Sequence, residues 1–300
     1  MVKSRFSQRR TKRRANDPRS GEQILSVSMA EFELMLTDAD LRLLDEAARA
    51  EQCGDLRHAL ACLQHTPRPI GNPWERDLTE MIELGPDAEP WQWARFTVSA
   101  ASRWVRSLHV PLVARILREV SIAADGAPGP SCPQCPGWVA GQAAVHTAIG
   151  GTLLFDELLL EVFLVQVAPV LAERGGGGRT WAQTRAKVYE LIDVQGIELQ
   201  VRDHAEHTIR TVRHLGELVG LSRHDLVYGH VIDVPGEPDS MFAMPPIVVD
   251  EIVAQRLERM HTPDLGDIDQ RCEVLGAAVR SGPPRLVRLA EASQGYEDAS

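Results

Sequence analysis

The chain lacks the short motifs that identify the common classes of enzyme. It contains no GxSxG nucleophile elbow, no GxxxxGK[ST] phosphate loop, no GxGxxG after a strand and no HExxH. The run RGGGGR at residues 174–179 is not a phosphate cradle, because it follows a helical pattern and leads into strand patterns. No catalytic residue is therefore predicted, and the sequence favours a non-catalytic protein.

Export and membrane signals are also lacking. The five cysteines are an odd number, and no apolar segment of the secretory type follows the basic start, so a reducing, cytoplasmic location is expected. The apolar run at residues 152–173 is long enough to span a bilayer. It contains Asp156, Glu157, Glu161 and Pro169, however, and we interpret it as a buried helix rather than a membrane span.

Lysine and asparagine are scarce, and the charge is unevenly distributed. Lysine supplies three of the 32 basic residues and asparagine occurs twice, a bias typical of GC-rich bacterial genomes. The first nineteen residues have a net charge of about +7. Because the net charge of the whole chain is −10, the remaining residues together carry about −17. Residues 1–27 are predicted to form a basic disordered arm. It is either solvated filler or an electrostatic tether for nucleic acid, formed by Arg9, Arg10, Lys12, Arg13 and Arg14.

Helical periodicity extends over residues 28–173, the predicted α-helical domain. Within it, the segment at residues 37–67 contains two helical patterns separated by Gly54, with Asp55 as a cap for the second. This helix-turn-helix resembles one unit of a tetratricopeptide repeat. A solenoid needs about three units, so a single helical hairpin is predicted.

An aromatic stripe follows in the segment EPWQWARFTVSAASRWVRSL. Trp93, Phe96, Ala100 and Trp104 fall on one face of the predicted helix, at steps of three and four residues. The pattern favours a helix buried by its tryptophans over an exposed aromatic platform.

The periodicity changes after the glycines. Residues 174–179 are predicted to be a flexible linker that trypsin cuts first, at Arg174 or Arg179. Five short strands with alternating patterns and a closing helix near residues 251–260 then form a small β-rich domain over residues 180–262. A poorly ordered tail is expected over 263–300. The predicted fold class is α+β, an all-α domain followed by a small antiparallel sheet or barrel.

Two cysteines stand close together in the stretch GPSCPQCPGWVAG. Cys132 and Cys135 form a CxxC pair, but the chain has no second CxxC and no HxxxH pair to complete a tetrahedral zinc site. A redox pair would follow a strand, and no strand pattern precedes this loop. The pair is interpreted first as an incidental loop, and otherwise as a zinc site completed from elsewhere or a redox site. No other cofactor is predicted.

Five histidines gather in the β-rich part: His204, His207, His214, His224 and His230. The first two form an HxxH in a predicted polar turn, where the rigid geometry and orienting partners of a metal site are lacking. Ordinary surface and core roles are favoured for all five.

The stretches ELQVRD, LGELVGL and DLVYGHVIDVPGEPDSMFAMPPIVVD carry a family resemblance. They resemble a strand entry of the accessory β-domains in some SEC-C-type proteins. The layout from about residue 40 to 260 is similar to uncharacterised bacterial proteins with a helical front half and a small β-domain. The zinc knuckle that names the SEC-C family is absent from this sequence, so its metal function is not carried over.

These observations predict a cytoplasmic interaction or regulatory protein that binds a protein partner through a helical groove or a sheet edge. The alternative is a nucleic-acid-associated protein that uses the basic arm. A third hypothesis is an enzyme with an unrecognised site in the cleft between the two predicted domains.

Overall fold

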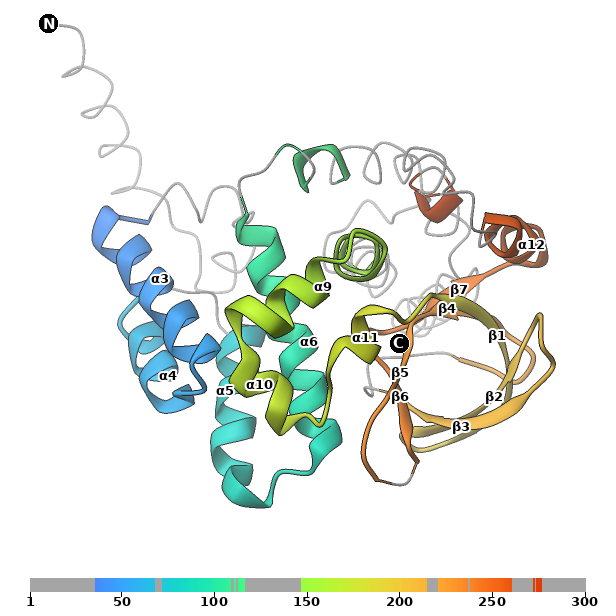
Figure 1. Cartoon of the computed structure of the whole chain (residues 1–300), viewed down its shortest axis with the longest axis horizontal. Coiled ribbons are helices and arrows are strands. Elements are labelled where there is room, and N and C mark those ends of the chain that lie inside the picture. The colour runs from blue at the N-terminus through green and yellow to red at the C-terminus, as the bar shows by residue number, and fades with distance from the viewer. Residues whose placement is uncertain are drawn as a thin grey trace, which may run out of the picture.

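The protein has an α+β fold in which helices come first and a curled sheet follows, confirming the predicted fold class (Figure 1). The computed structural model describes residues 36–67, 72–108, 111, 113–116, 147–214, 221–236, 238–260, 272 and 274–276.

The first two helices form the predicted hairpin. Helix α3 (Asp38–Gln52) begins with a capping box in which Thr37 and Asp40 satisfy each other's backbone N–H groups. Helix α4 (Leu56–Gln64) follows, and its N-cap Asp55 accepts from the backbone N–H of His58. Between them Gly54 adopts φ +79°, which only glycine takes readily, and this explains the tight turn.

Two longer helices pack against the hairpin. Helix α5 (Pro73–Leu84) has Asn72 as its N-cap and proline at its first position, where the missing N–H costs no hydrogen bond. A 3₁₀ turn, η2 (Gly85–Asp87), leads to α6 (Pro90–Ser107). Phe96 and Ala100 of the predicted aromatic stripe are buried in α6, whereas Trp93 and Trp104 are half-buried.

Largely buried charged side chains connect helices α3, α5 and α6. The Arg103 guanidinium of α6 donates to Glu51 of α3 across 2.6 Å and to Asp77 of α5 across 2.9 Å. The indole N–H of Trp74 donates to the same Glu51 carboxylate at 2.8 Å. Glu51 is only 3% exposed, and a buried carboxylate needs partners of this kind to offset its lost hydration. The network therefore fixes the mutual placement of three helices.

The apolar run at residues 152–173 is broken rather than continuous, which corrects the single buried helix that we predicted. It consists of a π-helical segment η3 (Thr152–Asp156), α9 (Leu159–Val162), a second π-helical segment η4 (Phe163–Val167) and α10 (Pro169–Arg174). Leu158 interrupts it with φ 56°, and Pro169 starts a new helix because it has no N–H to donate. Within the described parts of the chain, no helix combines the length and apolar character needed to cross a membrane.

Three of the four glycines after α10 lie close to side chains of the sheet part or of the helix that leads to it, Gly175 and Gly177 beside Trp181 and Gly176 beside Pro235. A Cβ on Gly175 would approach Trp181 at 2.8 Å and the backbone of Ala94 at 3.2 Å, and one on Gly177 would approach Trp181 at 2.1 Å. Trp181 belongs to the short helix α11 (Arg179–Ala182), and its indole donates to the carbonyl of Asp233 at 2.8 Å. Gly175 and Gly177 thus give room to the buried Trp181.

The sheet has seven strands in the order β5-β6-β3-β2-β1-β4-β7 and curls into a half-barrel (Figure 1). Its pairs are antiparallel, except that β3 runs parallel to β6. The strands are β1 (Lys187–Gln195), β2 (Glu198–Asp203), β3 (Ile209–Arg213), β4 (Leu226–Gly229), β5 (Val231–Asp233), β6 (Ser240–Phe242) and β7 (Ile247–Val249).

Seven strands replace the five predicted ones because two predicted strands are each divided. His230 separates β4 from β5, which lie in different parts of the sheet order, so the chain turns sharply at this residue. Pro245 and Pro246 separate β6 from β7, and proline interrupts a strand because it cannot donate to the ladder.

The predicted alternation of buried and exposed side chains holds at the centres of the strands but not at their ends. Leu199 and Val201 are fully buried, as predicted. Ile197 and Ile209, at the ends of two alternating patterns, are 47% and 58% exposed. Both lie beside turns, where the chain leaves the curl of the sheet.

One large core continues from the helices into the sheet. It joins Phe96, Leu153 and Leu171 of the helical part to Trp181 and Ile232, while a second cluster fills the curl of the sheet. The expected closing helix is α12 (Glu251–Met260), which packs on β1 and β4. In the predicted tail, Cys272, Val274 and Leu275 are described and buried.

Candidate functional site

The strongest site candidates from the sequence lie outside the described residues. This applies to the CxxC pair, Cys132 and Cys135, and to the basic arm over residues 1–27. The zinc, redox and nucleic-acid hypotheses that depend on them stay predictions.

Two histidines of the β-rich part are held by glutamates. The Nδ1 atom of His204 lies 2.6 Å from Oε1 of Glu258, which fastens the turn after β2 to α12. The Nδ1 atom of His224 lies 2.8 Å from Oε1 of Glu190 on β1. Each pair connects a turn to a regular element, so these histidines have structural roles.

The remaining three histidines lie at separate places in the sheet part. His207 is an exposed turn residue with φ 58°. A ring nitrogen of His214 bonds the carbonyl of Gly196 at 2.8 Å, and His230 is buried with its ring stacked on Phe155 at 4.1 Å. Within the described chain, none of the five histidines belongs to a group of three or more converging donor atoms.

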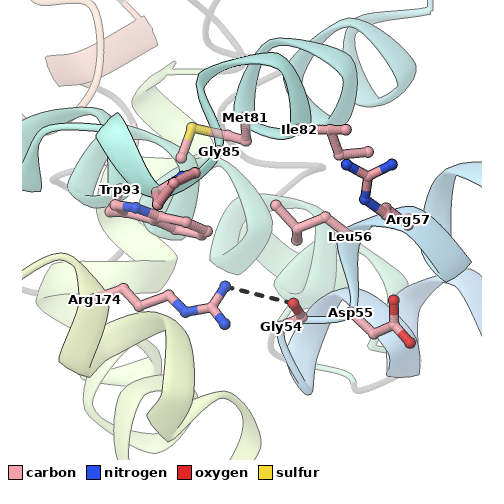
Figure 2. A pocket seen from close by; sticks show the side chains of 10 residues that line it. Gly54, Asp55, Leu56, Arg57, Met81, Ile82, Gly85, Trp93 and Arg174 are labelled. Carbon is pink, nitrogen blue, oxygen red and sulfur yellow. Dashed lines mark hydrogen bonds between the residues drawn. The ribbon is translucent and has the colours of Figure 1, made fainter.

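A cleft of about 470 Å³ lies in the helical part, between the hairpin turn and the ends of the neighbouring helices (Figure 2). Its volume falls within the roughly 300–1,000 Å³ typical of ligand sites. It is lined by Gly54, Asp55, Leu56, Arg57, Met81, Ile82, Gly85, Pro86, Trp93 and Arg174.

The hairpin turn shapes one wall of this cleft. Gly54 brings the start of α4 close to α10, and a Cβ added to this glycine would meet Val170 at 3.1 Å and the Arg174 guanidinium at 3.4 Å. The positive φ and this close approach both require glycine. Asp55 then starts α4, so the two residues that form the turn also position the cleft wall.

Trp93 and Arg174 form the opposite wall. The guanidinium carbon of Arg174 lies 4.7 Å from the centre of the Trp93 ring, a cation–π arrangement. Its Nη1 donates to the carbonyl of Gly54 across 3.4 Å, a long hydrogen bond (Figure 2). Arg174 is thus held over the tryptophan ring while most of its five N–H donors stay available to a ligand.

The lining carries two positive charges and one negative charge. In Figure 2, Arg174 and Trp93 lie on one side of Leu56 and Arg57 lies on the other. Within the described part of the chain, no carboxylate forms an ion pair with either guanidinium. Asp55 already accepts the backbone N–H of His58 as helix cap. The cleft is therefore suited to a ligand that brings its own negative charge.

A second, much smaller cavity lies where the helices meet the sheet. Its volume is about 20 Å³, and its lining includes Gly151, Thr152, Tyr228 and His230. This volume accommodates about one water molecule. The cavity is consequently too small for a substrate.

Three donor side chains of metal-binding type converge on the hairpin. Glu46, His58 and Cys62 place one carboxylate oxygen, one ring nitrogen and one sulfur within 4.8 Å of one another. The sequence gives no sign of this group, because Cys62 stands alone in the chain and its partners come from another turn of the same helix and from another helix.

The cleft residues were also missed as a site. The sequence pattern places Trp93 in a buried stripe and Arg174 at the end of a linker. The GD pair at Gly54 and Asp55 did mark the turn. That Arg174 returns to this turn from 120 residues away is a tertiary contact with no local signal.

Comparison with protein-family models, curated proteins and solved structures gives no match for this chain. The resemblance to SEC-C-type accessory domains therefore stays an expectation, and functional inference depends on the residues themselves.

Proposed function

We propose that the protein is a non-catalytic binding protein whose hairpin cleft holds a carboxylate-bearing segment of a protein partner. The observation that carries this proposal is the pair of guanidinium groups, Arg57 and Arg174, in a cleft of ligand size, neither of them ion-paired within the described chain. Trp and Arg are the residue types most enriched among side chains that dominate binding energy at protein interfaces.

The chemistry of the cleft defines its occupant. A guanidinium donates two parallel hydrogen bonds to a carboxylate, which gives both strength and orientation. Leu56, Met81 and Ile82 supply an apolar surface beside the arginines. A peptide with an acidic residue or a free C-terminus next to an apolar side chain satisfies both parts.

Prior ordering of Arg174 favours binding. Its position on Trp93 restricts the side chain before the ligand arrives, so less rotamer entropy is lost on binding. The protein as a whole is acidic, with a net charge of −10, and repels polyanions at long range. A ligand with one or two negative charges is therefore favoured over a nucleic acid at this cleft.

Selection from a library of random displayed peptides tests the proposal. Peptides selected on the wild-type protein should be enriched in acidic side chains or need a free C-terminus. Their affinity should fall about 10-fold or more in R174E, since a hydrogen bond to a charged group contributes about 1.5–3 kcal/mol. R57E should weaken binding in the same direction.

Arg185 offers a matched control because it is exposed and lies outside the cleft lining. R185E changes the net charge by the same amount as R174E and should leave peptide affinity unchanged. An equal loss in R185E would mean that overall charge drives binding. The proposal is rejected if the selected peptides neither contain acidic side chains nor need a free C-terminus, or if R57E and R174E bind them as tightly as the wild-type protein does.

A further inference from the structure

The hairpin carries a compact cluster of three side chains apart from the cleft lining. Oε1 of Glu46 lies 2.8 Å from Nε2 of His58, and the same nitrogen lies 3.7 Å from Sγ of Cys62. Two different donor groups thus converge on one ring nitrogen.

Helix geometry explains this convergence. His58 and Cys62 are four residues apart on α4, so both project from the same face. Glu46 projects from the antiparallel helix α3, which packs closely against α4. The two helices and the rigid Gly54 turn therefore hold the three groups together before any ligand binds.

Access to the cluster is open on one side and closed on the other. The side chains of Glu46 and His58 are each 49% exposed, whereas Cys62 is 6% exposed at the edge of the core. An ion can therefore enter from solvent and reach a sulfur that is shielded from bulk water.

We propose that Glu46, His58 and Cys62 bind one Zn²⁺ ion, with the fourth position of the tetrahedron open to water. Carboxylate oxygen, imidazole nitrogen and thiolate sulfur are the three ligand types that zinc takes in proteins. Three protein ligands with one open position is the composition of zinc sites that exchange a ligand, unlike closed four-ligand structural sites.

The charges and protons balance. In the metal-free protein a proton bridges the Glu46 carboxylate and the His58 ring, and burial raises the pKa of the Cys62 thiol so that it keeps its own proton. Zinc takes the lone pair of Nε2, so the bridging proton leaves this nitrogen and the neutral ring carries its proton on Nδ1, while the thiol proton leaves to solvent. One carboxylate and one thiolate then neutralise the ion's two positive charges. Small side-chain shifts, about 0.5 Å between oxygen and nitrogen, bring the atoms to zinc ligand distances.

Zinc titration of the full chain, stripped of metal by a chelator, tests this site. The titration uses the C132S/C135S background, so that the CxxC pair cannot contribute. One zinc per chain should bind and raise the melting temperature by on the order of 5 °C at saturation. Co²⁺ in place of zinc should give a sulfur-to-metal charge-transfer band.

Single variants identify the ligands. E46Q, H58Q and C62S should each weaken zinc binding by more than about 100-fold, beyond the effect of removing an outer-shell partner. C62S should also abolish the charge-transfer band. The matched variants H65Q, in the same helical region, and C53S, an exposed free cysteine, should bind zinc like their parent.

Melting curves without metal separate ligand loss from misfolding. E46Q and H58Q alter half-exposed side chains and should melt close to the parent in the apo state. No zinc bound by the C132S/C135S protein, or undiminished binding by folded E46Q and H58Q, would overturn the assignment.

Discussion

The Nη2 atom of Arg103 donates to Oε1 of Glu51 across 2.6 Å and so joins α6 to α3 inside the helical part. Both side chains are largely withdrawn from solvent, at 17% and 3% exposure. Removing the arginine should leave a buried carboxylate whose charge the indole N–H of Trp74 alone does not balance.

We expect R103M to lower the free energy of unfolding by about 3 kcal/mol, the cost of breaking a buried ion pair on one side. The double variant E51Q/R103M should be more stable than R103M because the uncompensated charge of Glu51 is gone, while Asp77 keeps its hydrogen bond from Ser99. Urea denaturation of the two single variants and the double variant measures this coupling. Strictly additive losses would show that the two groups act independently.

Glu51 should also affect how stability changes with pH. Burial raises its pKa above the ordinary 4.5, although the Arg103 guanidinium and the Trp74 N–H oppose the shift. The folded protein therefore binds this proton more tightly than the unfolded chain does. The resulting contribution of Glu51 to the free energy of unfolding is full below about pH 4.5 and is lost as pH rises through the folded pKa. As pH falls from 7 to 4, the free energy of unfolding of the wild type should therefore rise relative to that of E51Q. A difference that is constant with pH would contradict the shift.

Asp203 should behave in the opposite way. Burial alone would raise its pKa, but hydrogen bonds from Lys187 and from the backbone N–H groups of Glu206 and Ala205 outweigh it and lower the pKa below 3.8. Its contribution to stability is present above about pH 3.8 and is lost as pH falls through the folded pKa. The advantage of wild type over D203N should therefore shrink from pH 5 toward pH 2, measured by thermal melting. A growing advantage in acid would reverse the assignment.

The glycine run contains its own matched pair for a packing test. An added Cβ at Gly177 would lie 2.1 Å from ring atoms of Trp181, whereas at Gly178 it would meet nothing within 4 Å. Because Trp181 is 1% exposed and bonded to Asp233, its ring has little room to move. G177A should cost about 1–3 kcal/mol of stability, and G178A should change it by less than about 0.5 kcal/mol. Equal effects in urea denaturation would mean that the contact with Trp181 is unimportant.

Trypsin can report on the same contact. The packing of the glycines against Trp181 and Pro235 leads us to expect slow cleavage at Arg174 and Arg179, with one cooperative unfolding transition for the helical and sheet parts together. G177A should be cut there faster than wild type or G178A. Rapid cleavage of wild type into a helical and a β fragment would instead support the two-domain interpretation from the sequence.

The parts of the fold that depend on local chemistry could be predicted from the sequence. Thr37, Asp55 and Asn72 are caps that act within three residues, and α4 starts at the position that the Asp55 cap predicts. The turn at His230 and the interruption at Leu158 had no such signal. At these two positions tertiary packing determines the backbone conformation, and a local sequence pattern carries no information about such packing.

The candidate site was less predictable, for the same reason. Arg174 and Trp93 are 81 residues apart in sequence yet form one wall of the cleft. Each had a plausible local interpretation that concealed its partner. Cys62 likewise seemed isolated until α3 brought Glu46 beside its helical neighbour His58.

The lengths of the strands affect how the molecule behaves toward other copies of itself. The two ends of the sheet order are β5 and β7, each three residues long, whereas the nine-residue β1 is paired on both sides. A short edge offers few N–H and C=O groups for a foreign strand to pair with. The arrangement thus places β1, the strand with the most backbone groups available for pairing, in the interior of the sheet. This protects the folded chain against aggregation by strand addition.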